Sequence, residues 1–165
     1  MGYQVIGLVI FLVIIAGVVK FLLPLLAKKE PKTLPYESAG TLFSPAERSF
    51  LGVLEQAVGN DFKVMGKVRL ADIINIKKGL SGSERQQAFN RIQSKHVDFV
   101  VCDTKSLTLQ CVVELDDSSH QQAQRQERDA FVDKVMSAAG IHILHFSAKK
   151  SYSIQEVRDA IAGAK

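Results

Sequence analysis

The residues with the clearest chemical potential are carboxylates within and just after two apolar segments. Asp98 lies in "HVDFVV", while Glu114 and Asp116 lie in "VVELDDSSH". A carboxylate inside an otherwise apolar strand is unfavourable unless a cation or hydrogen bonds compensate for its burial. Hard cations such as Mg²⁺ prefer oxygen ligands of this kind. We therefore expect Asp98, Glu114 and Asp116 to form a Mg²⁺ site.

A Mg²⁺ ion held in this way would supply a specific chemistry. The ion can polarise a phosphodiester and lower the pKa of an attacking water. A nearby Lys or Arg can offset the charge that develops on the phosphate. The expected reaction is metal-dependent phosphodiester hydrolysis, which is the chemistry of a nuclease.

Structural roles are the alternative for the same residues. Asp98 and Glu114 could form a salt bridge across the strands with Arg91 or Arg128. An ion pair of this kind would stabilise the fold without binding a metal.

The residues after the second apolar segment have alternatives of their own. Asp116 and Asp117 could end the strand and interact favourably with the dipole of the following helix. By strand alternation Asp116 lies on the same face as Glu114, and Asp117 lies on the opposite face. Of these two aspartates, we therefore expect only Asp116 to be a metal ligand. His120 lies in the first turn of the predicted helix, where a histidine is commonly solvated.

Strand alternation determines which of these side chains share a face. Asp98 shares a face with Cys102, and Glu114 shares one with Asp116. If the two strands pair, the three carboxylates can converge. Cys102 and Cys111 point to opposite faces by the same rule, which argues against a disulfide between them.

The elements that must position the carboxylates follow from hydrophobic periodicity and capping signals. Ser44, Pro45 and Glu47 begin a helix with a capping box. The two apolar segments are joined by "TKS", which predicts an antiparallel hairpin in the middle of a sheet. The expected elements are a helix from 44 to about 59, a strand in the first half of 61–74, a short helix over 83–93, hairpin strands over 97–103 and 107–115, a helix over 119–139, a strand over 141–146 and a helix over 153–164.

The N-terminal residues have a different character. Residues 5–27 form an apolar run of 23 residues with one charge, Lys20. As a helix this run extends about 34 Å, enough to cross a hydrocarbon core of about 30 Å. It lacks the basic start, the short apolar region and the cleavage site of a signal peptide. Basic residues follow the run and none precedes it, so the positive-inside bias places the remainder in the cytoplasm.

The chain carries a formal net charge of +4 at pH 7, which permits contact with nucleic acid or anionic lipid without requiring either. The most basic region, residues 77–95, could contact a DNA backbone, an anionic membrane or only solvent. Arg125 and Arg128 are three residues apart on one face of the predicted helix. They could bind phosphates or remain solvated. The candidate nucleic-acid contacts are Lys77, Lys78, Arg85, Arg91, Lys95, Arg125 and Arg128.

Several segments, over roughly residues 42–148, resemble the bacterial domain-of-unknown-function family numbered 2726. They include "TLFSPAERSFLGVLEQA", "RQQAFNRIQSKHVDFVVCD", "VVELDDSSH" and "RQERDAFVDKVMSAAGIHIL". The family is similar in turn to the very-short-patch-repair endonucleases. Their Glu-x-Asp-x-x-x-His signature is met here by Glu114, Asp116 and His120.

The order of elements also resembles the restriction-endonuclease-like, or PD-(D/E)XK, superfamily, whose core is a helix, three strands, a helix and a strand. The resemblance implies a motif formed by Asp98 and the segment from Glu114 to Asp116. Val97 stands where the pattern has Pro, and Asp116 stands where it has Lys. The proton-handling or electrostatic role of the missing lysine could fall to Lys95, Lys134 or His120. Glu47 closes a capping box, although first-helix glutamates approach the metal site in some related nucleases.

We therefore expect an α/β protein with a restriction-endonuclease-like core (helix, three strands, helix, strand, helix) behind an N-terminal transmembrane helix. The anchor would span residues 1–27, the linker 28–43 and the nuclease-like domain 44–165, on the cytoplasmic side of a bacterial inner membrane. The leading hypothesis is Mg²⁺-dependent hydrolysis of DNA, with no small-molecule cofactor and the oligomeric state left open. The alternatives are an inactive nucleic-acid-binding or scaffolding domain and a tethered interaction domain. The candidate catalytic residues are Asp98, Glu114, Asp116, His120 and Lys134.

Overall fold

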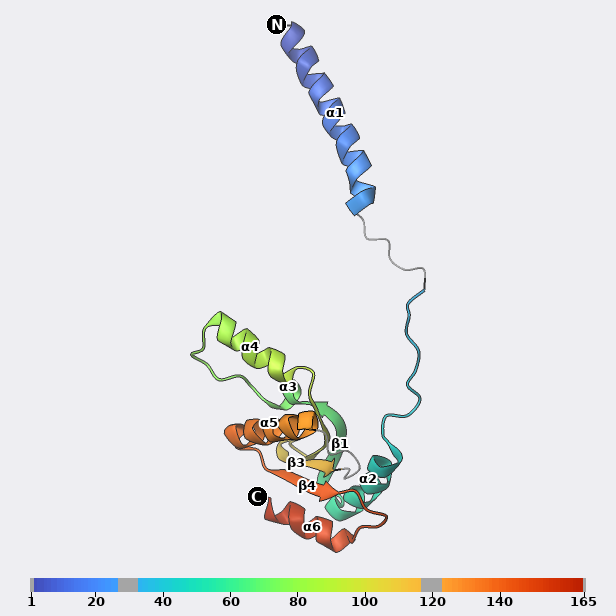
Figure 1. The fold of residues 1–165 in the computed structure, drawn as a ribbon, viewed down its shortest axis with the longest axis vertical. Helices are drawn as coiled ribbons and strands as arrows, with labels where there is room; N and C mark the ends of the chain where they lie inside the picture. Colours follow the sequence, from blue (N-terminus) through green and yellow to red (C-terminus); the bar gives the residue numbers. More distant parts are fainter. Residues whose placement is uncertain (1, 27–32, 117–122, 165) are drawn as a thin grey trace. The chain divides into compact units, whose positions relative to one another are not determined.

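The computed structural model describes residues 2–26, 33–116 and 123–164 (Figure 1). The chain divides into two compact units, Met1–Ala39 and Gly40–Lys165. The members of both hydrophobic clusters of the larger unit fall between Phe43 and Ala164. Residues 40–165 therefore contain a complete core of their own.

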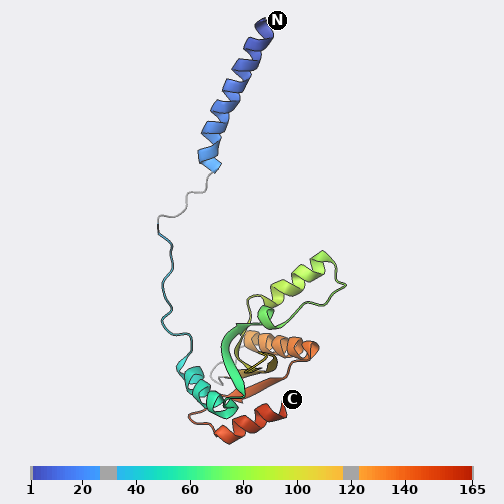
Figure 2. The same cartoon turned by 180° about the vertical axis from the view of Figure 1, so that it is seen from behind.

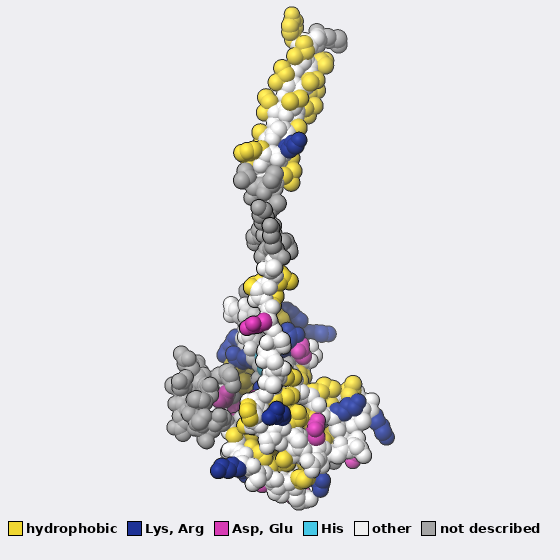
Figure 3. Space-filling view, turned by 90° about the vertical axis from the view of Figure 1, so that its right-hand side faces the viewer, with side chains coloured by type: hydrophobic (Ala, Val, Ile, Leu, Met, Phe, Trp, Pro, Cys, Tyr) yellow, Lys and Arg dark blue, Asp and Glu magenta, His cyan; other side chains and the backbone are white. Residues whose placement is uncertain are grey.

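The smaller unit consists mainly of helix α1, Gly2–Leu26. Its segment Gly2–Leu23 is long and apolar enough to cross a membrane, a property that it shares with signal sequences. Figure 3 shows mainly hydrophobic side chains on the visible face of this helix, and large hydrophobic residues from Tyr3 to Leu23 are exposed along its length, as expected of a helix whose surroundings are apolar. The expected apolar helix is confirmed, while its insertion and orientation remain predictions.

The larger unit is built on one mixed sheet in the order β1-β2-β3-β4. β1 pairs with β2 and β2 with β3 in antiparallel fashion, whereas β3 and β4 are parallel. The predicted hairpin of the two apolar segments and its central place in the sheet are confirmed. The strands are β1 Phe62–Arg69, β2 His96–Asp103, β3 Leu109–Asp116 and β4 Ile143–Ser147.

The helices follow the predicted order with one addition, the single turn of α3. At the start of α2, Ser44 and Glu47 form both halves of the predicted capping box, with Pro45 in the first turn. Ser153 caps α6 by accepting a hydrogen bond from the Glu156 N–H. The helices are α2 Pro45–Val58, α3 Leu70–Ile73, α4 Gly82–Ile92, α5 Ala123–Ala139 and α6 Ile154–Gly163.

The two faces of the sheet carry separate hydrophobic clusters. One cluster joins the sheet to α2 and α6, and the other joins it to α3, α5 and the end of α4 (Figures 1 and 2). Cys111 belongs to the first cluster and Cys102 to the second, and both thiols are free. This arrangement confirms the parity argument that placed the two cysteines on opposite faces.

Phe43 connects the residues before α2 to the sheet. Its ring stacks on that of Phe99 with centroids 5.5 Å apart. A Cβ atom added at Gly66 of β1 would collide with the Phe43 ring. Glycine at position 66 therefore makes room for the aromatic side chain that covers this end of the sheet.

Gly66→Ala is expected to lower the free energy of unfolding by about 1–3 kcal/mol, because the added methyl group pushes Phe43 off Phe99. Urea denaturation of residues 40–165 measures the change. Gly52→Ala in α2 is the matched control, since nothing lies within 4 Å of the added Cβ. The control should be neutral or stabilise by up to about 1 kcal/mol, and equal effects of the two substitutions would contradict the packing argument.

Candidate functional site

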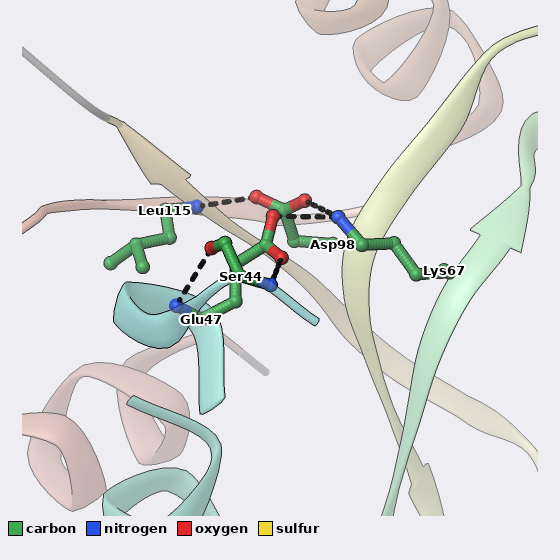
Figure 4. A network of polar contacts seen from close by, with 5 residues as sticks. All are labelled: Ser44, Glu47, Lys67, Asp98 and Leu115. Carbon is green, nitrogen blue, oxygen red and sulfur yellow. Dashed lines mark hydrogen bonds and ion pairs between the residues drawn. The ribbon is translucent and has the colours of Figure 1, made fainter. Parts of the chain in front are cut away.

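A lysine joins two carboxylates at one end of the sheet (Figure 4). The Nζ of Lys67 donates to Glu47 Oε1 at 2.6 Å and to Asp98 Oδ1 at 2.9 Å. The exposed fractions of the three side chains are 29% for Lys67, 18% for Glu47 and 17% for Asp98. The network therefore links α2, β1 and β2 in a partly desolvated setting, where charge interactions are stronger than in open water.

The position of Asp98 follows from the way β2 and β3 separate. Their pairing runs from Cys102 opposite Leu109 to Phe99 opposite Val113. Beyond this point the Asp98 side chain lies between the strands, and its Oδ2 accepts a hydrogen bond from the Leu115 N–H at 3.1 Å. The Asp98 oxygen thus accepts a hydrogen bond that a backbone carbonyl would accept in a regular strand pair. This role accounts for the presence of a carboxylate in an otherwise apolar strand.

Lys67 is held in an unusual backbone conformation. Its φ is +54°, in the left-handed region that non-glycine residues rarely adopt. The neighbouring pairs remain in the β1–β2 ladder, with Gly66 opposite Phe99 and Val68 opposite Val97. The strained backbone of Lys67 therefore lies between two regular strand pairs. Backbone strain of this kind is often found at functional sites.

The electrostatics of Asp98 favour its ionised form. Burial raises the pKa of its carboxyl, but the Leu115 N–H, the Lys67 ammonium and a hydrogen bond with Glu114 together lower the pKa below its ordinary value. The contact with Glu114 confirms that the two strand carboxylates converge. Asp98 is therefore an anion at neutral pH with Glu114 beside it.

Lys67 is charged in the same setting. Burial lowers the pKa of its ammonium, but Glu47 and Asp98 outweigh this effect and raise the pKa above its ordinary value. An amine that remains protonated at neutral pH cannot serve as a general base. In this arrangement Lys67 can act as a fixed positive charge and a hydrogen-bond donor.

Glu47 satisfies both of the roles considered for it. Its Oε2 accepts from the Ser44 N–H at 2.8 Å, as in a capping box, and its Oε1 accepts from Lys67. The structural alternative for Asp98, a salt bridge across the strands, is present, but its partner is Lys67 and not Arg91. The guanidinium of Arg91 lies 4.3 Å from the ring centroid of Phe131, and Asp98 pairs with Lys67 instead.

Asp116 has partners other than Asp98 among the described residues. Its carboxylate lies 3.2 Å from His145 Nδ1, while His145 Nε2 lies 3.1 Å from Asp133 Oδ1 of α5. Since β3 and β4 place Glu114 opposite His145, this cluster adjoins the Asp98 site. The histidine ties the end of β3 to α5 through both of its ring nitrogens.

His145 should make stability depend on pH. Burial lowers the pKa of its imidazole, but the carboxylates of Asp116 and Asp133 outweigh this effect and raise the pKa above its ordinary value. The stabilisation is therefore fully present below about pH 6.5, the unfolded value, and is lost as the pH rises through the folded pKa. Urea midpoints of the wild type and His145→Gln should differ most in mild acid and converge above that pKa. A difference that does not vary with pH would contradict this account.

The remaining candidates are distributed as follows. Lys95 Nζ lies 5.4 Å from the Phe131 ring centroid, on the same ring as Arg91. Lys134 is exposed on α5, next in sequence to Asp133. Lys77, Lys78 and Arg85 are exposed on the segment that contains α4. Asp117, His120 and the side chains of Arg125 and Arg128 lie outside the described residues.

The carboxylates of Asp98 and Glu114 fit a Mg²⁺ ion by their chemistry. Mg²⁺ commonly binds one or two carboxylates and completes its octahedral shell with waters and substrate phosphates. Within residues 2–26, 33–116 and 123–164, no group of three or more His, Cys, Asp and Glu side chains is placed to hold a metal. Since Asp116 pairs with His145, Asp98 and Glu114 are the two carboxylates that would hold such an ion.

Sequence reasoning did not identify Lys67 as a site residue. Strict strand alternation puts Lys67 on the polar side of β1 together with Lys63, Met65 and Arg69. A glycine followed by lysine inside a strand is the one local signal, because glycine in a strand often marks a bulge or close packing. That signal does not reveal which carboxylates the lysine will meet.

Comparisons with other proteins concern the larger unit. No curated protein and no solved structure matches the chain. A family model described as "Protein of unknown function (DUF2726)" matches residues 39–164, which include every residue of the network around Lys67. The chain therefore belongs to the DUF2726 family, as its sequence motifs suggested.

Proposed function

We propose that residues 40–165 form a metal-dependent nuclease domain that hydrolyses phosphodiester bonds in DNA. The observation that carries the proposal is the position of Lys67, whose Nζ bridges Glu47 and Asp98 while Asp98 contacts Glu114. Two carboxylates from the central strands β2 and β3 and an ammonium from the neighbouring strand β1 are the groups that a restriction-endonuclease-like site requires. Lys67 would supply from β1 the lysine that is absent at position 116.

Each residue then has a distinct role. Asp98 and Glu114 would hold a Mg²⁺ ion, which when bound polarises the scissile phosphate and acidifies a bound water. Lys67 would offset the negative charge that builds up on the phosphate. Glu47 would orient the Lys67 ammonium, and the Leu115 N–H would fix one oxygen of Asp98. The basic residues Arg91 and Lys95, which lie over the Phe131 ring of α5, would contact the DNA backbone.

We also propose that α1 anchors the protein in a bacterial inner membrane with the larger unit in the cytoplasm. The helix has the required length and apolar character. Lys28, Lys29 and Lys32 follow it in the sequence, and positive charges next to a span favour the cytoplasmic side.

A second candidate is a nucleic-acid-binding or scaffolding domain without catalytic activity. The observation in its favour is that Asp116, at the position of the missing lysine, pairs with His145. DNA binding by such a domain would weaken steeply with salt and leave the DNA intact.

The test is cleavage of plasmid and single-stranded DNA by residues 40–165 with Mg²⁺ or Mn²⁺. Asp98→Ala and Glu114→Ala should abolish cleavage, because each removes a carboxylate ligand of the ion. Asp159→Ala removes an exposed carboxylate of α6 and should cleave like the wild type. Equal cleavage by the wild type and both site variants would refute the proposal, and salt-sensitive binding without cleavage would favour the second candidate.

A further inference from the structure

The segment between α3 and β2, residues 74–95, forms an arm that projects from the sheet. Both views of the fold show the loop before α4 at the far end of the arm (Figures 1 and 2). Ile92, at the other end of α4, is buried in the cluster that includes Leu70. The arm is therefore anchored at its root, while its tip lies away from the core.

The arm carries the whole net positive charge of the chain. It contains five of the 21 Lys and Arg residues and one of the 17 Asp and Glu residues, which leaves 16 of each sign elsewhere. Its one carboxylate, Glu84, accepts hydrogen bonds from the Ser81 N–H and Oγ at the start of α4. With five basic residues and one carboxylate, the arm has a net charge of +4 that is available to an anionic partner.

The basic residues divide into two groups. Arg91 and Lys95 stack on Phe131 at the root of the arm. Lys77, Lys78 and Arg85 are exposed toward the tip. The second group lies on both sides of the short loop that precedes α4.

Apolar side chains are also exposed on the arm, and Leu80 lies between the cations of the tip. Leu80, between Lys78 and α4, is 44% exposed, and Phe89, one turn after Arg85, is 40% exposed. A phosphate backbone offers no apolar environment to a leucine. The boundary between lipid headgroups and acyl chains offers both an apolar environment and, in an anionic leaflet, negative charge.

We propose that the tip of the arm, residues 77–85, is a docking surface for an anionic lipid bilayer. Leu80 enters the headgroup region while Lys77, Lys78 and Arg85 contact the anionic headgroups. The lipid binding is independent of the proposed nuclease activity. The access of the arm to a bilayer rests on the proposed anchoring by α1. The 13 residues from 27 to 39 can span at most about 45 Å, so an anchored chain would keep the larger unit within reach of the membrane. A weak surface affinity then suffices, since tethering raises the effective concentration.

The first test is sedimentation of residues 40–165 with vesicles. The fragment should bind vesicles of mixed phosphatidylcholine and phosphatidylglycerol and should not bind phosphatidylcholine alone. Lys77→Ala combined with Lys78→Ala should lower the partition coefficient about 20- to 30-fold, because each lysine near an anionic surface contributes about 1 kcal/mol. Lys63→Ala combined with Lys105→Ala removes the same charge from exposed positions outside the arm and should change partitioning by less than about threefold.

A second measurement reports insertion directly. The chain contains no Trp, so Leu80→Trp introduces a single fluorophore at the tip. Its emission should shift to the blue with anionic vesicles, whereas that of Ile154→Trp on α6 should not. Absence of binding to anionic vesicles, or equal loss of binding in both lysine pairs, would overturn the proposal. Duplex DNA binding that depends on Lys77 and Lys78 in a fragment that ignores vesicles would assign the arm to nucleic acid instead.

Discussion

Replacing Lys67 by methionine is expected to lower the rate of DNA cleavage by about 100- to 1,000-fold, the usual cost of losing one electrostatic contact to a reacting group. The same substitution should strengthen Mg²⁺ binding. It removes the ammonium that lies 2.6 Å from Glu47 and 2.9 Å from Asp98, so the carboxylates attract a divalent cation more strongly. Single-turnover cleavage and calorimetric Mg²⁺ titration of residues 40–165 measure the two effects.

The opposite signs of these effects separate an electrostatic role from a structural one. A substitution that merely disturbed the fold would weaken metal binding and cleavage together. Lys63→Met is the matched control, because Lys63 is an exposed lysine of the same strand. It should leave both quantities unchanged. Unaltered cleavage by Lys67→Met, or weaker Mg²⁺ binding, would remove Lys67 from the site.

Phe50→Ala is expected to lower the free energy of unfolding of residues 40–165 by about 3–5 kcal/mol. Phe50 has no exposed surface, and its ring centroid lies 5.9 Å from that of Phe99, 5.1 Å from Phe146 and 4.8 Å from Tyr152. The substitution therefore loses buried apolar area and three aromatic contacts. It leaves a cavity where α2 meets the sheet, next to the helix turn that carries Glu47.

Urea denaturation followed by circular dichroism gives this free energy. Phe89→Ala is the control, since Phe89 is 40% exposed on the arm and its loss should cost less than about 1 kcal/mol. Similar losses for Phe50→Ala and Phe89→Ala would mean that the aromatic cluster does not form the centre of this core. The expected order of the two variants does not depend on whether the domain is a nuclease.

Local signals accounted for most of the elements. Ser44, Pro45 and Glu47 begin α2 as their spacing predicts, because capping involves residues three positions apart. The β2–β3 hairpin follows from two apolar segments and a short polar turn. The turn of α3 was not predicted, since four residues are too few to show a helical period.

The site was predicted only in part. Asp98 and Glu114 come into contact, as the predicted pairing of the two strands allowed. Asp116 shares that parity but pairs with His145, because a parallel neighbour, β4, places an imidazole beside the end of β3. Parity identifies a face of the sheet, and it does not identify the nearest partner on that face.

The sequence alone determined the apolar N-terminal helix, the order of elements, the central hairpin and the two carboxylates that meet between its strands. Only the tertiary structure decided that Lys67 pairs with one of them, Asp98, and with Glu47 of α2. Lys67 lies 20 positions from Glu47 and 31 from Asp98, and it reaches them from a left-handed backbone conformation between two regular strand pairs. Capping and periodicity act over a few residues, whereas this contact depends on the register of two strands and the packing of a helix across them.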